Sequence, residues 1–147
     1  MLSLALMRRG RLGIESEAES PIHQAVGAAA MLLADGTVLI GTAPDVINSS
    51  VELCHETEPF CAAHRMDQRI VASICLSRHT DGRYLVLSPC GVCRERLAIH
   101  GPDVMVSTAS PSDPTTPIWK KLKDVHLDYW VTPLMEPDEA AGWLPQA

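Results

Sequence analysis

The feature that most constrains this chain is a set of three cysteines and one glutamate in two short segments. Residues 54–56 read Cys-His-Glu, and residues 89–93 read Pro-Cys-Gly-Val-Cys. A Cys-x-x-Cys pair alone is weak evidence, because redox pairs and structural zinc knuckles share it. Together, the two segments offer three thiolates, at Cys54, Cys90 and Cys93, that hold one zinc ion and leave its fourth position open for water. A fold that satisfies this pattern must bring the two segments together.

Two other kinds of site use similar residues and stay open on this evidence. A structural zinc site needs a fourth ligand, which His55, His64 or His79 would supply. Such knuckles usually have paired Cys-x-x-Cys half-sites, whereas this chain has a single one. A thioredoxin-like redox pair leaves the spacing of Cys54 and Glu56 unexplained.

Strands are expected in segments rich in β-branched and apolar residues. These segments are residues 26–33, 37–40, 70–76, 84–87 and 104–107. The first two flank an Asp-Gly pair, which is typical of a β-hairpin, and a second Asp-Gly pair precedes the fourth.

Helices are expected between these strands. A Ser-x-x-Glu capping box at residues 49–52 predicts a helix from there to about residue 66, with a bend at Pro59. A shorter helix is expected over residues 90–99, because Gly101 and Pro102 follow it. Strands that alternate with helices indicate a layered α/β domain.

The cysteines fall at informative places in these helices. A helix start suits a metal ligand, because its unpaired N–H groups and dipole stabilise a thiolate. Residues two apart on a helix point to different sides, so Cys54 and Glu56 share one metal-bound water only near the helix end. Cys61 and Cys75 lie in apolar segments, and we expect both to be small core residues.

Composition and charge exclude several classes of protein. The chain has 147 residues, 46% of them hydrophobic and 20% charged, which fits a single folded domain spanning residues 1–147 and excludes general disorder. Its net charge of −6 repels a phosphate backbone, so nucleic acid is not an expected partner. Small basic groups at residues 8–11 and 120–123 are expected on solvated helix faces.

No membrane segment is expected from the sequence. The apolar residues 1–7 are too short for a secretory signal, and no stretch reaches the roughly 18 apolar residues of a membrane span. We therefore expect a cytoplasmic protein. In that compartment its five cysteines are expected to take part in thiol or metal chemistry rather than in disulfides.

Taken together, these motifs resemble the cytidine deaminase superfamily, and in particular small bacterial proteins similar to blasticidin S deaminase. The resemblance runs from about residue 26 to residue 130. Its most specific stretches are APDVINSSVELCHET (43–57) and LSPCGVCRERL (87–97).

The resemblance implies a single-domain, three-layer α/β sandwich in which a mixed five-stranded sheet carries helices on its faces. It also implies one zinc ion per chain, held by Cys54, Cys90 and Cys93. Glu56 falls on the family's proton shuttle, which takes a proton from zinc-bound water and delivers protons to the ring nitrogen and the departing ammonia. The product is the uracil form of a cytosine-containing nucleoside or analogue.

Some positions depart from the family pattern. Thr57 stands where many relatives have an arginine that offsets the thiolate charge, so Arg94 is the expected second-shell donor. The family's ribose-reading Asn-x-Glu falls on Ala43 and Asp45, and its ring-stacking Phe falls near Gln24. We expect Asp45 to read the sugar substituent of the substrate.

Other residues extend the expected site and assembly. Asn48 is a neighbour of the substrate pocket, and Tyr129 with Trp130 resembles an aromatic pair near the C-terminus of blasticidin S deaminase. Trp130 and Trp143 make the C-terminal segment a candidate subunit contact in a homo-oligomer, with a tetramer favoured. The alternative is a non-catalytic, zinc-stabilised binding module on the same fold, which has no use for Glu56 beside an open metal position.

Overall fold

The computed structural model describes residues 27–144 of the chain. Gln24, the basic group at residues 8–11 and the apolar residues 1–7 lie outside this range. Within it, no helix is long and apolar enough to cross a membrane.

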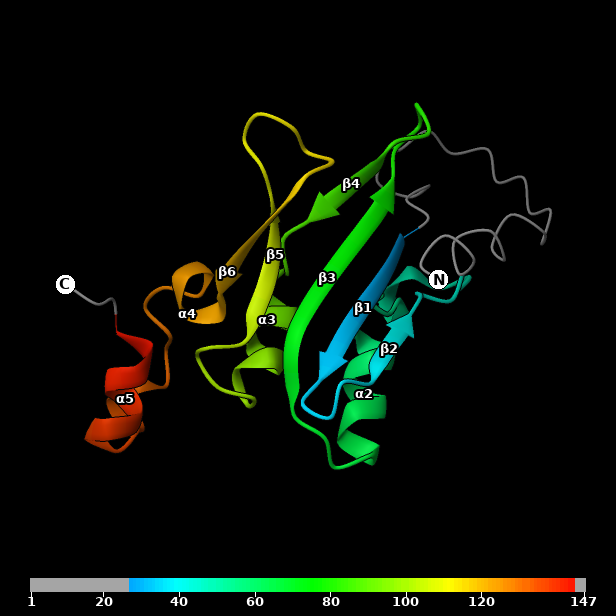
Figure 1. Ribbon diagram of the computed structural model, residues 1–147. Helices are drawn as coiled ribbons and strands as arrows, with labels where there is room; N and C mark the ends of the chain where they lie inside the picture. Colours follow the sequence, from blue (N-terminus) through cyan, green and yellow to red (C-terminus); the bar gives the residue numbers. More distant parts are fainter. Residues whose placement is uncertain (1–26, 145–147) are drawn as a thin grey trace.

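A mixed β-sheet forms the centre of the described structure (Figure 1). Its strands are β1 (Gly27–Leu33), β2 (Val38–Gly41), β3 (Ile70–Arg78), β4 (Tyr84–Leu87), β5 (Met105–Ala109) and β6 (Pro117–Lys121). They follow the order β2-β1-β3-β5-β6, and β4 pairs with β3. The β3–β5 pair is parallel and the other pairs are antiparallel. The predicted α/β class with a mixed sheet is therefore confirmed.

The five predicted strands correspond to β1 to β5, and β6 was not predicted. Lys120 and Lys121, expected on a helix face, lie on β6, and Lys123 lies in the short helix α4 (Leu122–Val125). Every residue of β6 is exposed, so the strand lacks the apolar alternation by which a half-buried strand is recognised. Lysines on an edge strand also discourage pairing with another chain.

The helix predicted to begin at the capping box is wrong at its start. Residues Ser49–Val51 form a separate 3₁₀ turn, η1, in which the Asn48 carboxamide oxygen accepts a hydrogen bond from the Ser50 N–H at 3.1 Å. Helix α2 begins later and spans Thr57–Arg65. Pro59 therefore lies in the first turn, where its missing N–H removes no intrahelical bond and no bend is needed.

The second helix was predicted well. Helix α3 spans Gly91–Ala98, with Cys90 as its N-cap. Downstream of β6, the chain forms α4, a 3₁₀ turn η2 (Thr132–Leu134) and α5 (Pro137–Trp143).

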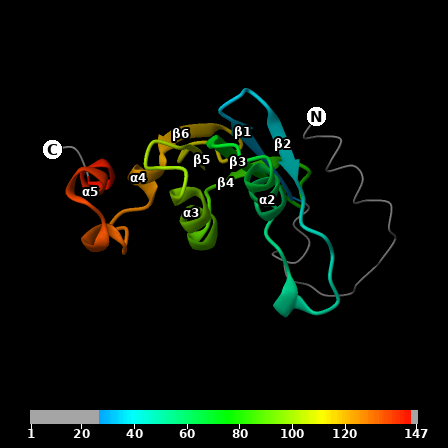
Figure 2. The ribbon, with the colours of Figure 1, turned by 90° about the horizontal axis from the view of Figure 1, so that it is seen from below.

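Helices α2 and α3 lie side by side against one face of the sheet (Figure 2). The main core fills this layer and is built from residues of β1, β3, β5, α2, α3 and α4. Its largest fully buried members are Met31, Leu33, Ile70, Leu97, Val104, Val106 and Leu122. Trp143 of α5 is 6% exposed and belongs to the same core, so this side chain packs within its own chain, and a subunit contact by the C-terminal segment stays a prediction.

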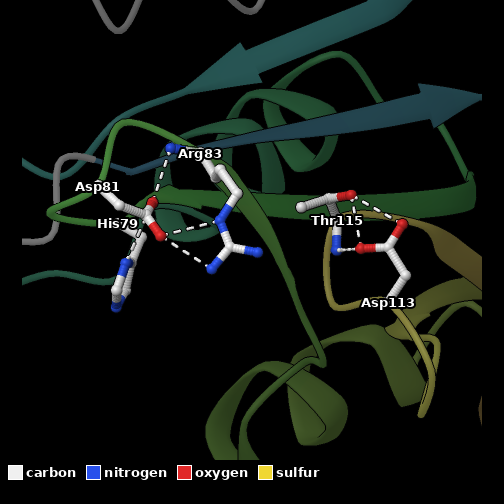
Figure 3. A network of polar contacts seen from close by, with 5 residues as sticks. All are labelled: His79, Asp81, Arg83, Asp113 and Thr115. Atoms are coloured by element: carbon white, nitrogen blue, oxygen red, sulfur yellow. Dashed lines mark hydrogen bonds and ion pairs between the residues drawn. The ribbon is translucent and has the colours of Figure 1, made fainter.

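Two loops at one end of the sheet each carry a polar network (Figure 3). In the β3–β4 turn, the Asp81 carboxylate accepts hydrogen bonds from the backbone N–H and the Nε of Arg83, which hold the pKa of Asp81 well below its usual range. In the β5–β6 loop, the Asp113 carboxylate accepts bonds from the backbone and hydroxyl of Thr115. These two turns are closed by their own side chains.

Candidate active site

Three cysteine sulfurs converge where the N-terminal ends of α2 and α3 lie together. Cys54 precedes α2, Cys90 caps α3, and Cys93 lies in the first turn of α3. The Sγ atoms of Cys54 and Cys93 are 3.4 Å apart, and so are those of Cys90 and Cys93. Across residues 27–144, these three residues are the group of metal-ligand type whose donor atoms all lie within 4.8 Å of one another.

This cluster fits a zinc ion. With Zn–S bonds of about 2.3 Å, a tetrahedral site places its sulfurs about 3.8 Å apart, close to the separations observed. Cys93 is buried, Cys54 is half-buried and Cys90 is exposed, so one side of the cluster opens toward solvent. Three thiolates with an open side match a catalytic zinc site better than a closed structural one.

The histidines considered as a fourth ligand do not join the cluster in the described structure. His79 lies in the β3–β4 turn, with its Nδ1 3.2 Å from the Asp81 carboxylate. His64 is in the last turn of α2. The geometry therefore gives no support to His64 or His79 as a fourth ligand, whereas the His55 side chain hydrogen-bonds with Cys54 alone of the three cysteines.

The thiols of Cys54 and Cys93 are coupled through their contact at 3.4 Å. Hydrogen bonding with Cys93, and then with His55, lowers the pKa of Cys54 to about 4. The same contact with Cys54, together with burial, raises the pKa of Cys93. The two thiols therefore titrate as a coupled pair.

The remaining cysteines lie outside the cluster. Burial raises the pKa of Cys75 to about 12, and this residue is a core thiol as predicted. Cys61 is exposed, so its predicted place in the core is wrong. The buried face of α2 carries Pro59 and Ala63. Cys61 is two positions from each of them, so its side chain points away from that face.

Glu56 is the acidic group of the site. Its side chain is 4% exposed, and the Ser73 hydroxyl of β3 donates a 2.9 Å hydrogen bond to its Oε1. Burial raises the pKa of Glu56, while hydrogen bonds from Cys93 and Ser73 lower it to a smaller extent. A buried carboxyl beside a metal cluster, oriented by a hydroxyl, is suited to proton transfer.

Ser73 was not predicted to belong to the site. It is a polar residue within the otherwise apolar segment Ile-Val-Ala-Ser-Ile-Cys-Leu of β3, and it is 3% exposed. A buried serine needs a hydrogen-bond partner, and this polar interruption was the available signal. The sequence did not show that its partner is Glu56, because Glu56 lies 17 residues away along the chain.

Two glycines allow the segment that leads into α2, residues 54–56, to lie close to the sheet. A Cβ on Gly27 would stand 2.5 Å from Nε2 of His55, and a Cβ on Gly41 would stand 2.6 Å from the His55 carbonyl oxygen and overlap the Pro59 ring. The segment that carries Cys54 and Glu56 is therefore placed against β1 and β2 by the absence of two side chains.

The substrate-binding residues predicted from the sequence lie on the segment between β2 and η1. Asp45 and Asn48 are both exposed, and Ala43 is 4% exposed. Asn48 closes the η1 turn through Ser50. A role for Asp45 and Asn48 toward substrate stays a prediction.

The residues after Cys93 hold the C-terminal segment. The Arg94 guanidinium, expected to offset the thiolate charge, donates to the Val125 carbonyl. The Glu95 carboxylate accepts hydrogen bonds from the Tyr129 hydroxyl at 3.2 Å and from Nε1 of Trp130 at 3.2 Å. The aromatic pair near the C-terminus is thus attached to α3 of its own chain.

Comparison with known proteins agrees with this fold. No protein-family model matches the chain. The cytidine deaminase of Mycobacterium tuberculosis (strain ATCC 25618 / H37Rv) is 41% identical over 78 residues, which make up 52% of this chain and 55% of that protein. The matched part thus spans about half the length of this curated relative.

Solved structures match over more of the chain. The crystal structure of the cytidine deaminase from Bacillus anthracis is 38% identical, with a TM-score of 0.70 over 81% of this chain and 84% of that one. The cytidine deaminase from Mycobacterium tuberculosis is 26% identical, with a TM-score of 0.60 over 88% of this chain and 94% of that one. The chain belongs to the cytidine deaminase superfamily.

Proposed function

We propose that this chain is a zinc-dependent aminohydrolase that converts a cytosine-containing nucleoside or nucleoside analogue to the uracil form. One water is consumed and one ammonia is released for each turnover. The observation that carries the proposal is the position of Glu56, a buried carboxyl oriented by Ser73 beside three converging thiols. A non-catalytic binding module would gain nothing from burying a carboxyl there.

Each residue of the site has a defined task in this reaction. Cys54, Cys90 and Cys93 would hold one zinc ion per chain, which supplies a Lewis acid that activates water. Glu56 accepts a proton from the attacking water and passes it to the ring nitrogen, and it then takes the proton of the newly attached hydroxyl group and passes it to the departing amino group. Ser73 fixes the carboxyl through Oε1. Because burial raises its pKa, Glu56 is suited to exchanging protons closer to neutral pH than an exposed glutamate.

The ligands are tested by elemental analysis of purified protein. We expect one zinc per chain, and loss of zinc when any of Cys54, Cys90 or Cys93 becomes Ala. Cys61→Ala and Cys75→Ala are matched controls that should keep the metal. Full zinc in the Cys90→Ala protein would contradict the ligand set.

The chemistry is tested separately by Glu56→Gln. This variant should keep its zinc and its fold and lose turnover by about 10²- to 10⁴-fold, the usual contribution of general acid and base catalysis. Turnover close to that of the parent protein would contradict the mechanism.

The substrate that we propose is a cytosine nucleoside analogue of the blasticidin S type rather than plain cytidine. Ala43 offers no hydrogen bond where the family reads ribose, and Gln24 offers no aromatic face. The two losses are worth roughly 1 to 3 kcal/mol together, or about 5- to 150-fold in kcat/KM. The exposed Asp45 carboxylate would pair with a cationic group on the analogue.

Side-by-side kcat/KM values for cytidine and blasticidin S test this choice, with the parent and Asp45→Asn proteins. Asp45→Asn should lower the value for blasticidin S and leave the value for cytidine unchanged. Efficient cytidine turnover in both proteins, with none of blasticidin S, would contradict the proposed substrate but not the deaminase chemistry.

We also propose a homo-oligomer, most simply a tetramer, in the cytoplasm, where thiols stay reduced and available as ligands. Large apolar side chains are exposed beside the site, on the segment between β2 and α2 and at the start of α3. They are Val46, Ile47, Val51, Leu53 and Val92. Exposed apolar groups gathered in this way are typical of a subunit interface. Light scattering should give a multiple of 16.0 kDa, and a strictly monomeric active enzyme would contradict this assembly.

A further inference from the structure

The charge of the cluster calls for a nearby cation. Three thiolates on Zn²⁺ leave one net negative charge, and the buried Glu56 adds another whenever it is ionised. Charges held away from water need partners, because an unpaired one is costly. The dipoles of α2 and α3 supply part of this compensation at their N-terminal ends.

Arg94 is placed for another task. Its guanidinium donates to the Val125 carbonyl, and its Nε is buried and has no hydrogen-bond partner in the described structure. This contact ties α3 to α4 and directs the side chain toward the C-terminal segment.

Arg96 is placed differently, across the gap between the two helices. Its guanidinium donates a 2.8 Å hydrogen bond to the Thr57 hydroxyl, which belongs to the first residue of α2. Arg96 follows Cys93 by three positions on α3, so the two residues share a helix face. The Thr57 N–H donates to the Cys54 carbonyl at 2.9 Å, so Thr57 is bonded to the segment that carries the other ligand.

A cation in this position is unfavourable unless an anion lies close by. The N-terminal end of α2 carries partial positive charge, which repels a guanidinium. Among the ion pairs described for residues 27–144, none joins Arg96 to a carboxylate. Two negative groups belong to the segments that Arg96 joins. One is the thiolate cluster, whose Cys93 lies one turn earlier on α3, and the other is Glu58 in the first turn of α2, whose carboxylate accepts a hydrogen bond from the Thr42 N–H.

We propose that Arg96, anchored by the Thr57 hydroxyl, is the positioning residue that offsets the thiolate charge and so retains the zinc ion. The inference rests on the proposed function. It assigns to Arg96 the task that the sequence pattern had suggested for Arg94, and it gives Thr57 the task of holding the guanidinium at the junction of the two helices.

Zinc affinity tests this role directly, measured by competition with a chromogenic chelator on purified, zinc-loaded protein. Arg96→Gln keeps a group able to bond Thr57 and removes the charge, so it should weaken zinc binding by about 10- to 100-fold, as is usual when an outer partner of a metal site is lost. Arg96→Lys keeps the charge and should recover most of the affinity. Thr57→Val, which releases the guanidinium, should give a smaller loss of the same sign.

Two further variants serve as controls for the measurement. Arg65→Gln, an exposed arginine in the last turn of α2, should leave zinc affinity unchanged. Arg94→Gln should lower Tm and have little effect on zinc affinity, because the partner of Arg94 is the Val125 carbonyl.

Several results would overturn the inference. They are parent-like zinc affinity in Arg96→Gln, equal losses in the Gln and Lys variants, or a larger loss in Arg94→Gln than in Arg96→Gln. If Arg96→Gln fails to fold, an unchanged affinity in Thr57→Val is sufficient to reject it. A parent protein that binds zinc but deaminates nothing contradicts the proposed function alone, whereas a parent that binds no zinc contradicts both.

Discussion

Replacing Gly41 by alanine tests how residues 54–56, which carry the proposed ligand Cys54 and the proposed acid Glu56, pack against the sheet. Gly41 ends β2 and pairs with Ala29 of β1, so its backbone cannot withdraw without breaking the sheet register. An added Cβ would overlap the Pro59 ring and stand 2.6 Å from the His55 carbonyl oxygen. Both neighbours are rigid, and neither can move aside by a side-chain rotation.

The size of the effect follows from this geometry. Overpacking a filled site costs about 1 to 3 kcal/mol, and rigid neighbours place Gly41→Ala near the upper end. With an unfolding entropy of about 2.1 cal/mol/K per residue, a 147-residue chain loses about 3 °C of Tm per kcal/mol. We therefore expect Tm to fall by about 10 °C, and zinc retention to fall with it because residues 54–56 are displaced.

Two matched glycine variants make the test specific, with Tm measured by calorimetry on zinc-loaded protein. In Gly27→Ala the new Cβ meets the His55 ring, which can rotate, so the loss should be nearer 3 °C, or about 1 kcal/mol. In Gly91→Ala nothing lies within 4 Å of the added Cβ, and alanine is the better helix former, so Tm should hold or rise slightly. A Gly41→Ala protein as stable as Gly91→Ala would refute the reasoning.

Three further predictions concern burial and ionisation. Trp143→Ala should cost about 3 to 5 kcal/mol in calorimetric stability because the ring is core, whereas Trp130→Ala, 64% exposed, should cost less than about 0.5 kcal/mol in a single subunit. The raised pKa of Glu56 means that this group favours the folded state below its unfolded pKa and that the benefit is lost as pH rises through the folded pKa. In zinc-free protein, the Tm of Glu56→Gln relative to the parent should therefore rise between pH 5 and pH 8, and a constant difference would contradict the shift. Thiol labelling of the native protein, mapped by mass spectrometry, should modify the exposed Cys61 quickly and spare the buried Cys75.

Local pattern was sufficient for much of the fold and for the identity of the site. The spacing of Cys54, Glu56, Cys90 and Cys93 predicted a metal site with an acid beside it, and the structure brings the three sulfurs together. Apolar and β-branched runs identified β1 to β5, and the start of α3 followed from its Pro-Cys sequence. These features depend on neighbours along the chain, and a sequence displays such neighbours directly.

Local pattern was misleading where tertiary contacts compete with it. The Ser-x-x-Glu sequence at residues 49–52 has the form of a capping box, yet Asn48 closes a short turn there and α2 begins only at Thr57. Strand β6 has no apolar alternation because all of it is exposed, so it exists through its pairing with β5. In the first segment a local side-chain hydrogen bond replaces the expected cap, and in the second the pairing with β5 outweighs local propensity.

By itself, then, the sequence determined which residues are candidates for the chemistry, and the tertiary structure decided how they are held. Ser73 reaches Glu56 across 17 positions, and Arg96 reaches Thr57 across 39. Gly41 matters only because Pro59 of α2 lies against it. These contacts depend on strand register and on the placement of two helices over one sheet face, which local spacing does not encode.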